Sequence, residues 1–406
     1  MENTIQSTKR AFLITNGCPE NRIDAAGMQA LLVSNGWAIT PDATQADMIF
    51  FNACGLTDDE ERDSLEIIRD LKRRKQEDAR LIVCGCFPRI HPAALEKLYD
   101  DITFGSDDIE SFSEIIQADP SGSYPCAHVL LPKTSTRFGV RKILSKFRKL
   151  SSPYFLWCRC WMSRRYQQYW EQVNLVHTHS YYVKVSTGCV NQCAYCAVKL
   201  SRGNIRSKPI QNILTEVCDG LKEGFSNIAL IGTDLGSYGI DRGVTLVELL
   251  REIVALPGDF RVKLRNVHPG LLIRKSHELL PIFETGKIDH MTSAIQAGND
   301  RILKLMNRNY AVEPYLATLD MLKKACPSLR IRSQMIAGFP SETEEEFQDS
   351  VRTIEKGPFD FVEVYPFSAR INTPAATLAN KLPSGVVMYR NYRLTKAVLE
   401  KLESKN

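Results

Sequence analysis

The sequence contains no apolar run long enough to span a bilayer, and its first residues, Met1–Gln6, lack the apolar core of a signal peptide. These two absences predict a cytoplasmic protein with no transmembrane segment. Because disulfides are rare in that compartment, we expect the twelve cysteines to be thiols or metal ligands. The 406 residues, of which 44% are hydrophobic, are enough for two or three domains, each with its own core.

Acidic residues are missing between positions 133 and 165, where ten basic residues occur. Since the net charge of the whole chain is only +5, the remainder is net acidic. Four apolar residues within 140–147 recur at helical spacing and predict a basic amphipathic helix, and three of the four tryptophans follow at 157–170. Such a segment suits RNA, an acidic peptide or a membrane surface, or a helix that docks on the core. We interpret the C-x-C pair at 158–160 as non-ligands.

Three cysteines lie within eight residues, at Cys189, Cys193 and Cys196. They follow an apolar run at 181–185, which predicts a strand, and residues 186–188, which predict a turn. Three thiolates on one loop can hold three irons of a cubane cluster, which leaves the fourth iron open to a small molecule. Zinc would usually bring a second pair of cysteines or a nearby histidine, and the sequence offers neither. The pattern therefore favours an iron–sulfur site over zinc.

The first 118 residues alternate between predicted strands and helices, the βαβ pattern of a doubly wound parallel sheet. We predict strands at 11–14, 48–51, 81–84 and 102–105, and helices at 23–34 and 60–75. Three of the strands end in polar turns that bear Cys18, Cys54 or Cys86. The carboxyl ends of parallel strands converge on one crevice, so these thiols can meet there. The alternative is that they are ordinary buried cysteines.

The C-x3-C-x2-C loop resembles the radical S-adenosylmethionine (SAM) superfamily, whose open iron binds the amino and carboxylate groups of SAM and whose cluster splits SAM to a 5′-deoxyadenosyl radical. The residues around the first three cysteines, at 16–21, 52–54 and 85–86, are similar to the radical SAM methylthiotransferases. Further similar stretches follow in family order, at 202–209, 232–239, 295–303, 306–310 and 336–347. The resemblance implies two [4Fe–4S] clusters, one on each set of three cysteines, whereas Cys84 is expected within a strand.

The resemblance also implies a partial (βα)6 barrel with its chemistry at the carboxyl ends of the strands. Its strands are expected at 181–185, 227–231, 262–264, 291–295, 329–336 and 361–364. SAM contacts are expected from Tyr195, Arg206, Gly232, Thr233, Asp234, Gln296 and Gly338. Gly232, Thr233 and Asp234 should meet the amino end of SAM, unless they form an ordinary glycine-rich loop. Gly338 should let the backbone approach the adenosine.

Asparagines accompany the first three cysteines, at Asn16, Asn21 and Asn52. They either line the cluster or cap turns, as asparagine often does. We find no conventional acid–base pair, and hydrogen abstraction by a radical needs none.

The expected domains are an iron–sulfur domain at 1–118, a basic aromatic insertion at 119–179, a radical SAM domain at 180–375 and a C-terminal helix at 376–406. Two positions depart from the family, with Ala297 in place of serine and Gln334 in place of an acid. The small C-terminal β-barrel of the family (the TRAM domain) is expected to be absent.

The resemblance implies replacement of an unactivated C–H by C–S–CH3. One SAM would methylate sulfur at the first cluster, and a second SAM would be cleaved at the other. The departures, the insertion and the missing barrel favour a peptide or natural-product precursor as substrate. The alternative is transfer RNA, supported by the basic segment and by residues 232–239, which are closest to the branch that modifies threonylcarbamoyl-adenosine.

Two other readings stay open, a radical SAM methylase or cyclase and a non-catalytic iron–sulfur RNA-binding protein. For an enzyme, the resemblance implies an electron donor of flavodoxin or ferredoxin type and a sulfur donor.

Overall fold

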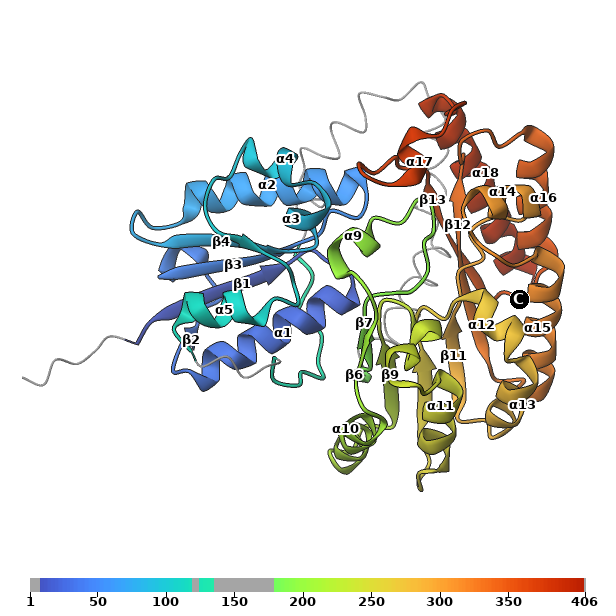
Figure 1. The fold of residues 1–406 in the computed structure, drawn as a ribbon, viewed down its shortest axis with the longest axis horizontal. Coiled ribbons are helices and arrows are strands. Elements are labelled where there is room, and N and C mark those ends of the chain that lie inside the picture. Colours follow the sequence, from blue (N-terminus) through green and yellow to red (C-terminus); the bar gives the residue numbers. More distant parts are fainter. Residues whose placement is uncertain (1–7, 119–123, 135–178, 405–406) are drawn as a thin grey trace, which may run out of the picture. The chain divides into compact units, whose positions relative to one another are not determined.

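The computed structural model describes residues 8–118, 124–134 and 179–404, which form two compact units (Figure 1). Of the described residues, unit 1 holds 8–118, 124–134, 197–203 and 370–372, and unit 2 holds 179–196, 204–369 and 373–404. The predicted basic helix, the three tryptophans and the C-x-C pair lie outside the described residues. Among the described helices, none has both the length and the apolar character needed to cross a bilayer.

Unit 1 is built on a five-stranded sheet with the order β2-β1-β3-β4-β5, in which all neighbouring pairs are parallel. The strands are β1 (Arg10–Thr15), β2 (Ala38–Ile39), β3 (Met48–Ala53), β4 (Arg80–Gly85) and β5 (Thr103–Phe104). The helices are α1 (Pro19–Ser34), the 3-10 helix η1 (Ala43–Gln45), α2 (Asp58–Arg74), α3 (Phe87–Ile90), α4 (Pro92–Glu96), α5 (Ile109–Ile116) and α9 (Val198–Arg202). The predicted doubly wound parallel sheet is confirmed.

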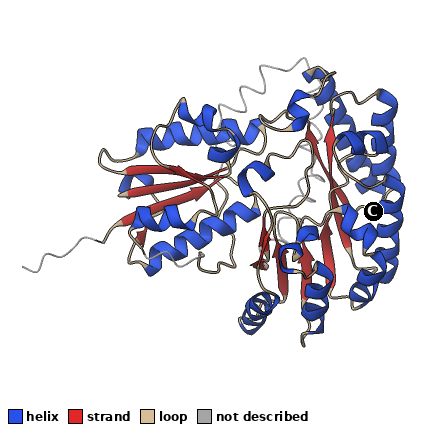
Figure 2. Ribbon diagram, viewed as in Figure 1, coloured by secondary structure: helices blue, strands red, loops and turns tan. Residues whose placement is uncertain are grey.

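Helices cover both faces of the unit 1 sheet (Figure 2). Alternation along the strands separates the core of this unit into two clusters. On β3, Phe50 packs with residues of α1 and α5, whereas the adjacent Phe51 packs with residues of α2. Cys84 is completely buried in β4, as predicted. Helix α2 begins at Thr57, whose hydroxyl accepts the Glu60 amide N–H at 3.3 Å.

Unit 2 holds a six-stranded parallel sheet with the order β13-β12-β11-β10-β9-β6. Its strands are β6 (Tyr181–Lys184), β9 (Asn227–Ile231), β10 (Arg261–Leu264), β11 (Ile288–Thr292), β12 (Arg330–Ala337) and β13 (Phe361–Pro366). Its helices are α10 (Ile210–Lys222), η3 (Leu235–Ser237), η4 (Ile240–Arg242), α11 (Leu246–Ala255), α12 (Pro269–Arg274), α13 (Ser276–Glu284), α14 (Asp300–Leu305), α15 (Val312–Ala325), α16 (Glu344–Lys356), α17 (Pro374–Thr377) and α18 (Ser384–Ser404).

Two predictions for unit 2 were wrong in detail. The strand expected at 291–295 is β11, three residues earlier, because the ladder with β12 ends at Thr292 and is followed by an isolated bridge between Gln296 and Met335. The turn expected at 186–188 is instead a short strand, β7 (Ser186–Thr187). It pairs antiparallel with β8 (Arg206–Ser207).

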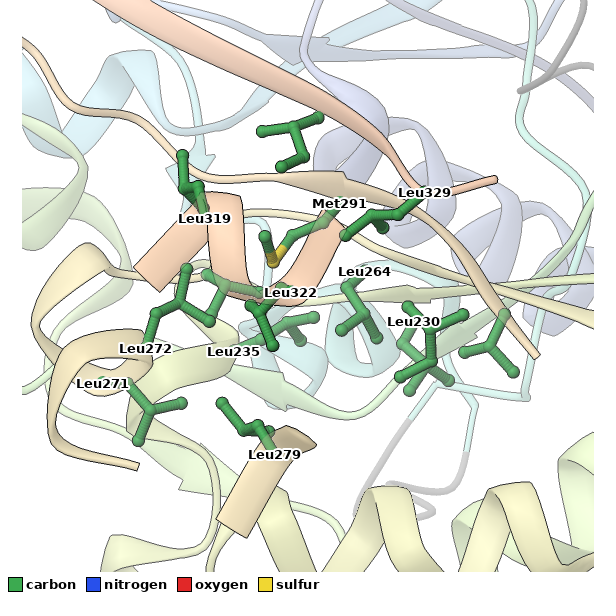
Figure 3. Close-up of a cluster of buried hydrophobic side chains, with 14 of the residues drawn as sticks. Leu230, Leu235, Leu264, Leu271, Leu272, Leu279, Met291, Leu319, Leu322 and Leu329 are labelled. Atoms are coloured by element: carbon green, nitrogen blue, oxygen red, sulfur yellow. The ribbon is translucent and has the colours of Figure 1, made fainter. Parts of the chain in front are cut away.

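The two faces of the unit 2 sheet differ in polarity. Leucines of β9 and β10 and of the helices pack on one face, together with Met291 (Figure 3). On β10, Val262 and Leu264 belong to this apolar core, whereas Lys263 between them is buried outside it. His290 and Arg332 are likewise buried outside that core. The face opposite the helices is therefore polar, as expected of a barrel interior that receives a ligand.

Candidate metal centres

The three cysteines of unit 1 follow three neighbouring parallel strands. Cys18 is the N-cap residue of α1 after β1, Cys54 follows β3, and Cys86 follows β4. The amide N–H of Cys86 donates to the carbonyl of Ala53 at 3.0 Å, which joins two of these turns. Besides desolvation, the charge of Cys86 raises the pKa of both the Cys18 and the Cys54 thiol, so the three thiols lie near one another, and the predicted convergence is confirmed.

Asparagine side chains fix the turns that carry these cysteines. The Asn16 amide oxygen accepts the Cys54 backbone N–H at 2.9 Å, and the Asn21 amide oxygen accepts from the Cys86 thiol at 3.3 Å. The Asn52 amide N–H donates to the carbonyl of Asn21 at 3.2 Å. The three asparagines therefore hold the cysteine turns together, and Asn21 also contacts a thiol.

A buried arginine lies next to these thiols. Arg202 is only 1% exposed, and its guanidinium contacts Asp24 at 2.5 Å, Glu20 at 3.7 Å and the Asn21 amide oxygen. Burial raises the pKa of the Cys18 thiol, the charge of Glu20 raises it further, and Arg202 opposes both. The site thus holds two buried thiols, Cys54 and Cys86, beside the exposed Cys18. Buried thiolates form only if a cation compensates them.

A second arginine of unit 1 also comes from late in the chain. The guanidinium of Arg370 contacts Asp58 at 2.6 Å and also pairs with Glu61, and its side chain is 4% exposed. Both carboxylates belong to helix α2. The segment 370–372 is thereby anchored to unit 1.

In unit 2, Cys189 lies beside the carboxylate of Asp234. The Cys189 sulfur is 3.6 Å from Asp234 Oδ2 and 3.7 Å from the Ser237 hydroxyl. It also accepts a hydrogen bond from the backbone N–H of Asn191 at 3.3 Å. Burial raises the pKa of Asp234, and hydrogen bonds from Ser237 and Gly236 oppose that rise. The network joins the cysteine loop to the loop that follows β9.

Arg308 organises the other side of the cysteine loop. Its Nη1 lies 3.6 Å from the Cys193 sulfur and donates to the Tyr195 hydroxyl at 2.8 Å. Its Nη2 donates to the carbonyl of Ala294 at 2.7 Å, and the Asn307 amide donates to the carbonyl of Gln192 at 2.7 Å. A positive charge next to a cysteine sulfur stabilises the thiolate form that a metal requires.

Gln296 lies in a strained and buried place. Its backbone φ of 73° lies in the left-handed region, which is unfavourable for any residue other than glycine. The residue is 9% exposed. Within the described part of the chain, its amide oxygen has no hydrogen-bond partner. Such an oxygen is the kind of group that a bound polar ligand would satisfy.

The remaining expected cofactor residues have structural contacts as well. Thr233 accepts the Gly188 amide N–H at 3.0 Å, and Arg206 lies exposed in β8, opposite Thr187 of β7. A Cβ at Gly232 would lie 2.7 Å from the Ser186 hydroxyl. A Cβ at Gly338, where φ is 77°, would lie 2.8 Å from Val387. Close packing against α18 therefore explains Gly338 without any ligand.

Two family descriptions match the chain. Residues 183–354 match the radical SAM superfamily, and residues 10–105 match a family described as uncharacterized protein family UPF0004. The two matches cover the described elements that carry both sets of cysteines.

Curated relatives extend along nearly the whole chain. The ribosomal protein uS12 methylthiotransferase RimO of Chlamydia pneumoniae is 31% identical over 95% of this chain and 76% of its own length. The chain belongs to the radical SAM methylthiotransferase family. A probable threonylcarbamoyladenosine tRNA methylthiotransferase of Pyrococcus abyssi is 30% identical over 96% of this chain and 84% of its own length. The threonylcarbamoyladenosine tRNA methylthiotransferase MtaB of Thermotoga maritima is 29% identical over 92% of this chain and 78% of its own length.

Solved structures share the fold. The radical SAM methyltransferase TsrM of Kitasatospora setae, with tryptophan and a SAM analogue bound, has a TM-score of 0.59 at 13% identity, over 91% of this chain and 75% of its own. The cobalamin-dependent radical SAM enzyme OxsB has a TM-score of 0.55 at 10% identity, over 98% and 56%. At these identities, the likeness supports the architecture alone.

Membership makes the protein a transferase, with SAM and two [4Fe–4S] clusters as the cofactors of the methylthiotransferase family. The residues present fit these groups. Each set supplies three thiols, one fewer than a fully protein-ligated cluster, and a buried arginine lies beside each set. Near the second set, the amide oxygen of Gln296 is available to a ligand.

The relatives do not support the expectation of a peptide or natural-product precursor. Their names specify transfer RNA or a ribosomal protein as the target. That expectation weighted the departures at Ala297 and Gln334 heavily. In the structure, both residues are accommodated by ordinary packing or hydrogen bonding. Ala297 is a buried part of a small apolar cluster, and the amide of Gln334 donates to the Glu363 carboxylate at 2.9 Å.

Several residues at the two sites were not singled out from the sequence. Arg202 and Arg308 were visible only as parts of family-like stretches, and Glu363 only as part of a predicted strand. Their roles depend on partners distant in sequence, such as Asp24, 178 residues before Arg202. A basic residue within a stretch that already matches the family was the only available signal.

Gly298 follows Gln296 closely and is tightly packed against helix α16. A Cβ at this position would lie 2.5 Å from Ser350 Cα and 2.6 Å from the Asp349 carbonyl oxygen, which are backbone atoms that cannot easily move. We expect Gly298→Ala to lower the free energy of unfolding by about 1–3 kcal/mol, measured as a lower urea midpoint. Gly385→Ala, where a Cβ meets nothing within 4 Å, is the control. Equal midpoints for the two variants would contradict this packing argument.

Proposed function

We propose that the protein transfers a methylthio group to an adenosine of transfer RNA, so that a C–H bond of the base becomes C–S–CH3. The observation that carries the proposal is the pair of relatives named for threonylcarbamoyladenosine in transfer RNA, which align over 78% and 84% of their own lengths. The loop at 232–239, which resembles the same branch, supports it. A cytoplasmic location follows from this substrate.

Within this proposal, Cys18, Cys54 and Cys86 hold one cluster, and Cys189, Cys193 and Cys196 hold the other. The bound clusters and SAM supply sulfur methylation and hydrogen abstraction by a radical. The protein's own contribution is to present three thiolates at each site and to leave one iron open. An external electron donor, of flavodoxin or ferredoxin type, and a sulfur donor are required in addition.

The side chains around the second cluster position it and its ligand. Asp234 holds the Cys189 side of the loop through Asn191, whose amide donates to Asp234 Oδ2 at 2.8 Å. Arg308 holds the Cys193 side through Tyr195. The free amide oxygen of Gln296 can accept from a bound ammonium or hydroxyl group. We assign Gly232, Thr233 and Arg206 to the surroundings of SAM and not to the chemistry.

The test is nucleoside mass spectrometry of transfer RNA from the source organism with and without the gene. We expect one methylthio-adenosine derivative to disappear on deletion, to return with the wild-type gene, and to stay absent with Cys196→Ala. Cys218→Ala is the matched control, because Cys218 lies on α10 and belongs to neither set of cysteines, so this variant should restore the nucleoside fully.

A ribosomal protein is the second candidate, because RimO of Chlamydia pneumoniae is a 31% identical relative. The same deletion strain distinguishes the two. Unchanged nucleosides together with a lost methylthio group on a ribosomal protein would overturn the transfer RNA proposal and leave the family assignment intact.

A further inference from the structure

Unit 2 contains a pocket that the proposed reaction does not use. It has a volume of about 870 Å³ and lies entirely within this unit. Its lining is mostly polar and includes the cationic side chains of Arg261, Lys263, Lys287 and Arg330. Pockets of this volume accommodate molecules the size of a nucleotide.

The pocket lies at the amino ends of the strands. Asn227, Arg261 and Arg330 are the first residues of β9, β10 and β12, and His179 precedes β6. The cysteine loop and Asp234 follow the carboxyl ends of β6 and β9, so they lie at the opposite edge of the same parallel sheet (Figure 1). The pocket is therefore distinct from the site that holds Cys189.

The lining carries more positive than negative charge. Four side chains are cationic, Arg261, Lys263, Lys287 and Arg330, and two are acidic, so the formal sum is +2 with neutral histidines. One of the acids, Asp259, is 87% exposed and pairs with Arg261 at 2.5 Å, which is a weak surface interaction. The other acid, Asp289, lies near the buried Lys263.

Two side chains at the inner end of the pocket, Lys263 and the uncharged His290, are buried. Lys263 is 4% exposed, and burial lowers its pKa, which the charge of Asp289 only partly offsets. Burial also lowers the pKa of His290 to about 3, and the nearby charges of Arg332 and Arg265 lower it further. His290 is therefore neutral and can act as a hydrogen-bond donor or acceptor. Positive charge held in this way attracts an anion more strongly than it would in water.

We propose that this pocket is a binding site for phosphate groups, in which Arg261 and Arg330 at the rim and Lys263 further in contact the oxygens of a di- or oligophosphate. Guanidinium groups bind phosphate through paired N–H donors, and a lysine adds a point charge. A cation would be repelled by the excess positive charge, and an apolar ligand would leave the polar lining without partners.

The phosphates have two possible sources, a free nucleotide-like molecule or the backbone of an RNA. The second source rests on the proposed function, whereas the phosphate site itself does not. Because the pocket lies at the far edge of the sheet from the cysteine loop, an RNA backbone held here would anchor the substrate away from the reacting base.

The test uses pyrophosphate as the probe and the full-length, cluster-loaded protein. We expect calorimetric titration to show saturable binding to the wild type, weakened at least tenfold in the double variant Arg261→Gln/Arg330→Gln. Arg251→Gln, on the exposed face of α11, removes one positive charge elsewhere in unit 2 and should change the dissociation constant less than twofold. Iron content and circular dichroism check that the variants are folded.

The proposal is overturned if pyrophosphate does not bind the wild type at millimolar concentration, or if the double variant binds it as tightly. If the phosphates belong to an RNA backbone, bulk transfer RNA should compete with pyrophosphate. Its salt slope, the change of log affinity with log salt concentration, should become shallower by about 1–2 in the double variant. Pyrophosphate binding that transfer RNA does not disturb would support the phosphate site and assign it to a free molecule. Methylthio-adenosine formation is scored separately, so a failed pocket and a failed function give different results.

Discussion

Replacing Cys18, Cys54 and Cys86 with alanine should remove about half of the roughly eight irons expected from two [4Fe–4S] clusters in the anaerobically reconstituted protein. It should also abolish methylthio transfer while SAM is still cleaved to 5′-deoxyadenosine. The reason is that the two sets of thiols belong to separate units, and each set has its own arginine and hydrogen-bond network. Iron analysis, together with chromatography of 5′-deoxyadenosine and of the product, measures all three quantities.

Cys84→Ala is the matched control for this experiment. Cys84 lies in β4, two residues before Cys86, and it is completely buried within the core of unit 1. We expect this variant to keep its full iron content and its methylthio transfer. If the triple variant also retained all of its iron, the assignment of a cluster to unit 1 would be wrong.

Replacing Arg202 with methionine should have the largest effect on stability. The substitution removes a buried cation and leaves Asp24 and Glu20, both almost completely buried, without their partner. Breaking one side of a buried ion pair typically costs about 3–5 kcal/mol. Hydrogen exchange of the amides of α1, the helix that carries both acids, should therefore become faster by on the order of a hundredfold to a few thousandfold.

Arg62→Met provides the comparison, because Arg62 pairs with Asp59 on the surface of the same unit, with side-chain exposures of 71% and 64%. An exposed pair contributes less than about 1 kcal/mol, so α2 exchange should change only slightly. Similar small effects in both variants would show that the Arg202 pair contributes no more than a surface interaction.

The cysteines of unit 1 were predictable because the argument needed only local information. A buried strand, a polar turn and a cysteine recur around Cys18, Cys54 and Cys86, and parallel topology brings such turns together. The bond of Asn16 to the Cys54 backbone was not predictable, since it depends on which rotamer fits beside the neighbouring turn. The register of β11 was missed for a related reason. Apolar residues continue to Ile295, but the ladder with β12 ends at Thr292.

In unit 2, Asp234 was predicted from the sequence as a SAM contact, and its carboxylate lies 3.6 Å from the Cys189 sulfur. Gln334 was interpreted only as the loss of an acid. The structure shows Glu363 at the paired position of β13, with its carboxylate bonded to Gln334 and to the Tyr365 hydroxyl at 2.9 Å each. A carboxylate is thus present beside the altered position, supplied by a neighbouring strand. Single-sequence reasoning cannot see such a replacement, because it compares positions along the chain and not across the sheet.

Arg202 and Arg370 have a consequence for how this protein could have been assembled in evolution. Both arginines complete unit 1, although they lie far beyond the first 118 residues that the sequence presents as a self-contained domain. A gene fragment encoding only that stretch would carry Asp24 and Glu61 without the cations that neutralise them. The unit is therefore not a portable module. Recombination that exchanged this unit for a relative's copy would also have to exchange the short segments Ala197–Gly203 and Arg370–Asn372. We therefore expect unit 1 and unit 2 to be inherited together.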